Sequence, residues 1–109
     1  SSDFNTKELK LLDKKNIAVV LSNTSTVIYI QINQETIKLS EKIEDEPHLV
    51  LEGSPISFIN YFNNVSGEHN IKISGQAALA EHFSKIFTKI NIDWEQIISE
   101  YTNDEFAFY

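Results

Sequence analysis

The sequence predicts a single two-layer α+β domain, in which helices cover one face of a β-sheet. At 109 residues the chain has room for one hydrophobic core. Most of the expected strands alternate apolar and polar residues, so one face of the sheet meets water. The second half of the chain contains helices with one apolar side each, and these must cover the other face of the sheet.

The chain is expected to begin with a polar lead-in over residues 3–15, helical in character and anchored by Leu9, Leu11 and Leu12. Residues 17–21 then form an uninterrupted apolar run, which is typical of a strand buried on both faces. The polar residues after this run predict a turn.

Two more strands are expected over residues 27–32 and 36–39. Isoleucines occupy every second position of the first strand, and Ile37 and Leu39 share one face of the second. Between the strands, Asn33-Gln34 is expected to form a tight hairpin turn, because Asn accepts positive φ. Together with residues 17–21, these segments predict an antiparallel meander.

An acidic loop over residues 41–47 leads to two similar units, each made of a short strand followed by a helix. The strand of the first unit covers residues 48–52, and its helix begins with Ser54 as N-cap and Pro55 as first helical residue. The strand of the second unit covers residues 70–73.

The two later helices have clearer sequence signals. The helix of the second unit has one apolar face, made of Leu79, Phe83, Ile86, Phe87 and Ile90. The last helix is expected to begin at Asp93, which forms a capping box with Gln96.

Aromatic residues are concentrated in the helical half of the chain. Of the twelve aromatic residues, ten lie from residue 58 onward: Phe58, Tyr61, Phe62, Phe83, Phe87, Trp94, Tyr101, Phe106, Phe108 and Tyr109. Such side chains can fill a core beneath helices or form the walls of an apolar ligand pocket. The pattern by itself favours a packed core over a pocket.

Composition excludes several classes of function. The formal net charge is -7 and all nine basic residues are lysines, so the chain lacks the basic face and the arginines of a nucleic-acid-binding protein. It contains no cysteine, which excludes disulfides and thiol catalysis. No apolar run approaches the ~20 residues of a transmembrane helix.

No catalytic or metal-binding motif is recognisable. The histidines His48, His69 and His82 lack metal-ligand spacing, and there is no GxSxG nucleophile motif. Asp93 and Glu95 resemble a carboxylate pair, but residues in a first helical turn normally serve as cap and dipole partners. We therefore expect a protein that is not an enzyme and has neither cofactor nor metal.

Four segments in order resemble the sterol carrier protein type 2 domain family. They are LVLEGSP at residues 49–55, IKISGQAALA at 71–80, NIDWE at 91–95 and EYTND at 100–104. Within that family the similarity is greatest to the N-terminal domain of UbiJ-type ubiquinone-biosynthesis accessory factors, and it covers roughly residues 9–106. Asn103 departs from the pattern, since the family usually has Gly there.

The resemblance implies a mixed five-stranded sheet in the order 3-2-1-4-5, with an apolar tunnel between the sheet and the helices. It implies a non-catalytic lipid-binding domain over residues 1–109 that holds a hydrophobic ligand, by analogy a polyprenylated ubiquinone precursor. Expected partners are ubiquinone-biosynthesis enzymes or accessory proteins, and the expected location is the cytoplasm. The family's N-terminal helix is expected before residue 1, and a C-terminal extension after Tyr109.

The expected ligand-binding residues are Phe58, Phe62, Phe83, Phe87, Ile90 and Trp94, with Trp94 near an opening. Two arrangements remain open, an accessible pocket or one closed by a second copy of the chain in a homodimer. The alternative function is a ligand-free scaffold subunit of a biosynthetic complex, built on the same fold with a filled interior.

Overall fold

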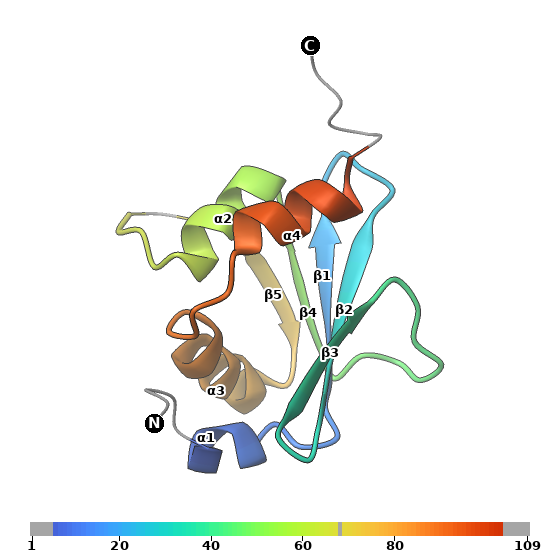
Figure 1. The fold of residues 1–109 in the computed structure, drawn as a ribbon, viewed down its shortest axis with the longest axis vertical. Coiled ribbons are helices and arrows are strands. Elements are labelled where there is room, and N and C mark those ends of the chain that lie inside the picture. The colour runs from blue at the N-terminus through green and yellow to red at the C-terminus, as the bar shows by residue number, and fades with distance from the viewer. Residues whose placement is uncertain (1–5, 68, 104–109) are drawn as a thin grey trace.

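The computed structural model describes residues 6–67 and 69–103, which form a sheet covered on one side by helices (Figure 1). Phe106, Phe108 and Tyr109, which the sequence groups with the other aromatics, lie outside the described residues. The strands are β1 (Asn16–Leu21), β2 (Val27–Asn33), β3 (Thr36–Ser40), β4 (Leu49–Gly53) and β5 (Lys72–Gly75). The helices are α1 (Thr6–Lys10), α2 (Pro55–Phe62), α3 (Ala77–Phe87) and α4 (Trp94–Tyr101).

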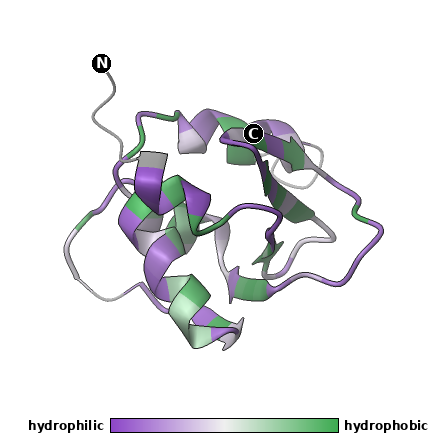
Figure 2. Cartoon of the chain, turned by 90° about the horizontal axis from the view of Figure 1, so that it is seen from below, coloured by the Kyte–Doolittle hydropathy of each residue, from purple (hydrophilic) through white to green (hydrophobic). Residues whose placement is uncertain are grey.

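The five strands form one mixed sheet in the order β3-β2-β1-β4-β5, which confirms the expected topology. The central strands β1 and β4 run parallel, whereas β1–β2, β2–β3 and β4–β5 are antiparallel. Ile17 lies between Ile30 and Leu49 across the sheet, so the three buried side chains share the face beneath the helices. The loop from β3 to β4 is mostly hydrophilic and projects on the other side of the sheet (Figure 2).

The turn between β2 and β3 lies one residue later than the sequence predicts. Asn33 is still paired with Thr36, so the turn residues are Gln34 and Glu35 rather than Asn33-Gln34. Both have positive φ, 50° and 66°, as a type I′ hairpin requires. The amide of Gln34 donates to the Asp13 carboxylate at 2.8 Å, and this bond from outside the hairpin supports the less common conformation.

The predicted N-terminal helix and its anchors need correction. α1 covers only Thr6–Lys10, and of the three leucines Leu9 and Leu12 are buried while Leu11 is 52% exposed. Because α1 ends at Lys10, Leu11 and Leu12 lie after the helix, and the three leucines do not share one buried face. The part of the expected lead-in before residue 6 lies outside the described residues.

The helix starts in the second half follow local sequence signals. The Ser54 hydroxyl accepts from the Ser57 amide at 3.1 Å at the start of α2, as predicted. At α4 the Asp93 carboxylate accepts from the Gln96 amide at 3.1 Å. The Gln96 side chain, however, donates to Glu100 at 3.2 Å, so it extends along the helix rather than back to Asp93, as the expected capping box requires.

Candidate functional site

Six aromatic side chains from three helices gather beneath the helical layer, and we call them the aromatic cluster. Its members are Phe58, Tyr61 and Phe62 of α2, Phe83 and Phe87 of α3, and Trp94 of α4. Five of the six are at most 2% exposed, and Tyr61 is partly buried against the same core. The cluster is therefore the main body of apolar surface on the helical side of the core.

The helical layer consists of two pairs of helices. α2 packs with α4 across one end of the sheet, and α1 packs with α3 at the other (Figure 1). The aromatic cluster lies where the two pairs meet, because Phe58, Tyr61, Phe62 and Trp94 come from the first pair and Phe83 and Phe87 from the second. We call this boundary the seam.

The two closest ring stacks each lie within one side of the seam. Phe62 and Trp94 stack with ring centroids 3.9 Å apart, and Phe83 and Phe87 stack at 4.3 Å. Across the seam, Phe62 meets Phe83 edge-on at 6.2 Å, and Phe87 meets Trp94 at 6.1 Å with the rings tilted. The closest stacking therefore lies within each side, and the contacts across the seam are edge-on or tilted, at centroid distances that are ordinary for such geometry.

A polar interaction also crosses the seam. A side-chain hydrogen bond joins Tyr61 of α2 to Ser84 of α3. Burial raises the pKa of the Tyr61 phenol, and this hydrogen bond opposes part of that effect. Tyr61 was not among the predicted binding residues, although its position three residues after Phe58 places both on neighbouring parts of one helical face.

Trp94 contributes a polar atom that has no partner. The side chain is 2% exposed, and its indole Nε1 has no hydrogen-bond acceptor among the described residues. Buried Trp N–H groups normally find an acceptor. The aromatic cluster therefore contains one unsatisfied donor within otherwise apolar surroundings.

The structure brings five of the six predicted binding residues into the aromatic cluster. Ile90 does not belong to the cluster, and it also lies outside its predicted helix, since α3 ends at Phe87. Thr88 caps that end and its hydroxyl donates to the Ser84 carbonyl at 2.7 Å. Ile90 then packs against the core from the following turn, partly buried. The role of these six residues as ligand walls stays a prediction.

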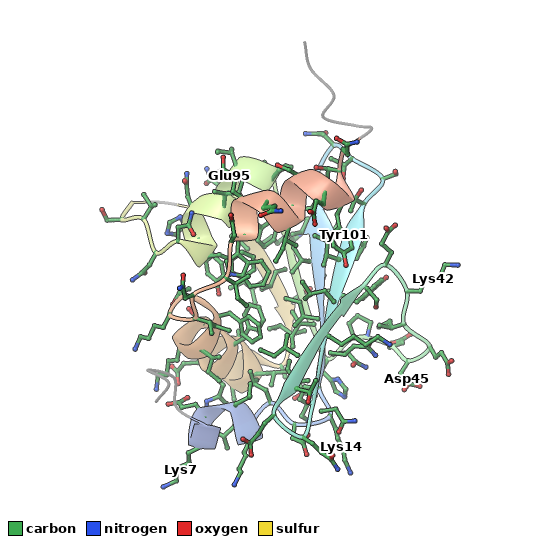
Figure 3. All side chains as sticks on the ribbon, in the orientation of Figure 1. Lys7, Lys14, Lys42, Asp45, Glu95 and Tyr101 are labelled. Carbon is green, nitrogen blue, oxygen red and sulfur yellow. The ribbon has the colours of Figure 1, made fainter. Side chains whose placement is uncertain are left out.

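Surface pockets described in the structure are lined by other residues. One of about 530 Å³ lies between the end of β3 and the end of α4, and its lining residues are Ser40, Glu41, Lys42, Glu100 and Tyr101. Lys42 extends outward from the domain, whereas Tyr101 lies at the end of α4 (Figure 3). Burial raises the pKa of the Tyr101 phenol, and the negative charges of Glu41 and Glu100 add to that effect.

The histidines lie in three separate surroundings. His48 Nδ1 accepts from the Asn16 amide at 3.0 Å, which fixes the β1–β4 junction. His82 faces Glu8 at 4.0 Å between α3 and α1, and the His69 ring lies edge-on to Tyr61. Within residues 6–67 and 69–103 no three His, Cys, Asp or Glu side chains gather into a metal-binding group.

Within the described residues, no helix is both long enough and apolar enough to cross a bilayer. Comparison of the sequence with protein-family models and with curated proteins finds no match.

Solved structures with the same fold do exist. The chain is similar to a protein described as "UbiJ-SCP2 Ubiquinone synthesis protein", with a TM-score of 0.61 and 10% identity, covering 84% of this chain and 77% of that one. It is also similar to part of the stereoselective inverting sec-alkylsulfatase Pisa1 from Pseudomonas sp., with a TM-score of 0.63 and 10% identity. That match covers 83% of this chain and 16% of the sulfatase. These likenesses establish a sterol carrier protein type 2 fold.

Proposed function

We propose that this chain is a non-catalytic lipid-binding domain that holds the tail of a hydrophobic ligand between the two helix pairs. The observation that carries the proposal is the seam, where buried aromatic rings from both pairs meet by edge-on and tilted contacts rather than by parallel stacks. The fold shared with a ubiquinone-synthesis protein supports a polyprenylated ubiquinone precursor as the ligand. On this proposal the chain acts in the cytoplasm with ubiquinone-biosynthesis enzymes or accessory proteins.

The energy for binding comes from removing the tail from water. Burial of hydrocarbon contributes roughly 0.8 kcal/mol per CH₂, so two isoprene units of five carbons each supply several kcal/mol. This gain requires smooth apolar walls and no charged residue. The aromatic cluster offers such walls, since its members have no group that is charged at neutral pH.

On this proposal, ligand uptake at the seam leaves the closest ring stacks intact. When the α2–α4 pair moves away from α3, two contacts are broken. They are the edge-on contact of Phe62 with Phe83 and the tilted contact of Phe87 with Trp94. The Phe62–Trp94 and Phe83–Phe87 stacks each remain on one side. The tail then replaces the lost contacts with its own, and the Tyr61–Ser84 hydrogen bond acts as a clasp that must open.

The second candidate is a ligand-free scaffold subunit, and the packing of the same rings favours it. Phe83 and Phe87 stack at 4.3 Å, and Phe62 and Trp94 at 3.9 Å, which is the close contact of a filled core. A scaffold would keep the seam closed at all times. The two candidates therefore differ in whether a lipid enters, which binding measurements decide directly.

The test has two parts. The protein is first purified gently without detergent, and an organic extract is analysed by mass spectrometry for quinone-type or fatty lipids. Saturable binding of a geranylated phenol to the lipid-free protein is then measured by calorimetry. Co-purified lipid or saturable binding supports the carrier, and the absence of both leaves the scaffold.

A pair of variants ties the binding to the seam. Phe87→Leu removes a ring from the seam. It is expected to lower the affinity for the geranylated phenol by about tenfold or more, which corresponds to a loss of roughly 1.4 kcal/mol of binding free energy. Ile32→Val removes one buried methyl group on β2, next to the Lys15 backbone, and serves as a control for general loss of core stability. Equal effects of the two variants would argue against binding at the seam.

A further inference from the structure

The buried indole N–H of Trp94 is the most informative polar group that the proposed function does not use. The side chain is 2% exposed, and among the described residues no acceptor lies within hydrogen-bond reach of Nε1. A buried donor without a partner is unfavourable, because it loses its bonds to water and gains none. Native proteins keep few such groups, and each one calls for an explanation.

Two other buried polar atoms lack hydrogen bonds, but their surroundings explain them. Glu8 Oε2 and His82 Nδ1 face each other at 4.0 Å between α1 and α3. They form an ion pair whenever His82 is protonated. Trp94 has no such neighbour, since its ring packs against Phe62 and Phe87.

We propose that the Trp94 indole N–H donates a hydrogen bond to an oxygen acceptor on the head group of the ligand. This inference rests on the proposed function and deepens it. It places the head group at the seam beside α4, with the isoprenoid tail continuing between the helix pairs. The domain thereby distinguishes a ligand with a ring oxygen from a hydrocarbon of the same shape.

The chemistry of the cluster favours a neutral acceptor. A carboxylate brought to Trp94 would be buried among uncharged aromatic side chains, without a cation from the cluster to balance it. A quinone carbonyl accepts one hydrogen bond without that cost. A prenylated quinone, which carries a neutral carbonyl beside an isoprenoid tail, fits these requirements.

The chain contains a single tryptophan, so one nuclear magnetic resonance signal reports on this bond. Lipid-free protein labelled with nitrogen-15 is titrated with geranylated benzoquinone, geranylbenzene and laurate. We expect the indole proton to move downfield and to exchange more slowly with water only in the presence of the quinone. Geranylbenzene tests tail binding without an acceptor, and laurate tests a charged acceptor.

Calorimetry with variants supplies an independent measurement. Trp94→Phe keeps an aromatic ring and removes the donor. It should therefore lower the affinity for the quinone by roughly three- to tenfold and change the affinity for geranylbenzene by no more than about twofold. Phe87→Leu should lower the affinities for the quinone and for geranylbenzene to a similar extent. Circular dichroism and thermal unfolding confirm that each variant is folded, and Trp94→Phe should lose little stability because it removes an unsatisfied donor.

The outcomes separate this inference from the proposed function. Saturable quinone binding with an unchanged indole signal, or equal losses for quinone and geranylbenzene in Trp94→Phe, overturns the hydrogen bond and leaves the lipid carrier standing. Laurate binding that depends on Trp94 as strongly as quinone binding overturns the assignment to a neutral carbonyl. Failure of all three ligands to bind overturns both the inference and the carrier.

Discussion

Phe62 of α2 and Trp94 of α4 stack face to face, with ring centroids 3.9 Å apart and planes inclined by 15°. The contact joins the last residue of one helix to the first residue of the other, although 32 positions separate them in the chain. Both side chains are at most 2% exposed, so the stack fixes how the α2–α4 pair lies over the sheet. In the proposed function, this stack forms one wall of the ligand site at the seam.

The Phe62–Trp94 stack should be visible as an energetic coupling. We expect Phe62→Leu and Trp94→Leu each to lower the free energy of unfolding, by about 1–4 kcal/mol for the lost ring and the space it leaves. The double variant should lose less than the sum, with a coupling of about 0.5–1.5 kcal/mol. Urea denaturation of the four proteins measures this cycle, and strict additivity would show that the stack contributes only burial.

Gly75 lies where β5 pairs with β4, and its replacement should lower the free energy of unfolding. Comparison with Gly67 separates the effect of a steric clash from that of backbone strain. Gly75 and Gly67 have similar positive φ, 107° and 113°. A Cβ at Gly75 would lie 2.6 Å from the His48 carbonyl oxygen, whereas one at Gly67 meets nothing within 4 Å. Gly67→Ala should lose about 1–3 kcal/mol through backbone strain, and Gly75→Ala clearly more. Similar losses in thermal unfolding would mean that β5 shifts freely away from His48.

Local signals in the sequence predicted the elements well where each signal acts within a few residues. Ser54 and Asp93 both cap the helices that they were expected to cap. The hairpin turn moved by one residue because a distant group, the Asp13 carboxylate, holds the Gln34 amide. The order of the strands came from the resemblance to a family, since spacing alone does not say that β1 pairs with β4.

The candidate site was also predicted only in part, because sequence signals act within one helix and the site is formed by several helices. Periodicity places Phe83 and Phe87 on one side of α3, but it does not say which rings from other helices they meet. The edge-on contact across the seam and the Tyr61–Ser84 bond depend on how two helix pairs are packed. The unsatisfied indole of Trp94 is likewise a property of the packed structure, since nothing in its sequence neighbourhood marks it.

The start of α3 offers a stabilising substitution. Gln76 has the extended conformation of an N-cap residue, with φ -78° and ψ 112°, but its side chain makes no cap hydrogen bond. Gln76→Asp supplies a carboxylate that can accept from the first free amides of the helix and that suits the positive end of its dipole. We expect the free energy of unfolding to rise by about 0.5–1 kcal/mol.

Gln76→Ala is the matched control, since it shortens the side chain without adding an acceptor. It should leave the urea midpoint almost unchanged. A gain from Gln76→Ala equal to that from Gln76→Asp would assign the effect to loss of the Gln side chain, and no gain from either would show that the amides at this helix start are already satisfied.

Tyr61 should make the stability of the domain fall at alkaline pH. Burial raises the pKa of its phenol in the folded state above the ordinary value of 10.0, while the unfolded chain keeps that ordinary value. The folded state therefore holds the proton more tightly. The resulting stabilisation is fully present below pH 10, and it is lost as the pH rises through the pKa of the folded state, because the unfolded chain releases the proton first.

Tyr61→Phe separates this effect from the titration of lysines, which is common to both proteins. Near neutral pH the variant should be less stable by about 0.5–1.5 kcal/mol, because it lacks the hydrogen bond with Ser84. Above pH 10 the wild-type protein should lose its advantage, so that the difference between their free energies of unfolding narrows as the pH rises. Urea denaturation from neutral to strongly alkaline pH measures that difference. A constant difference would show that the pKa of the Tyr61 phenol is not raised in the folded state. Equal stability of the two proteins at neutral pH would argue against the hydrogen bond with Ser84.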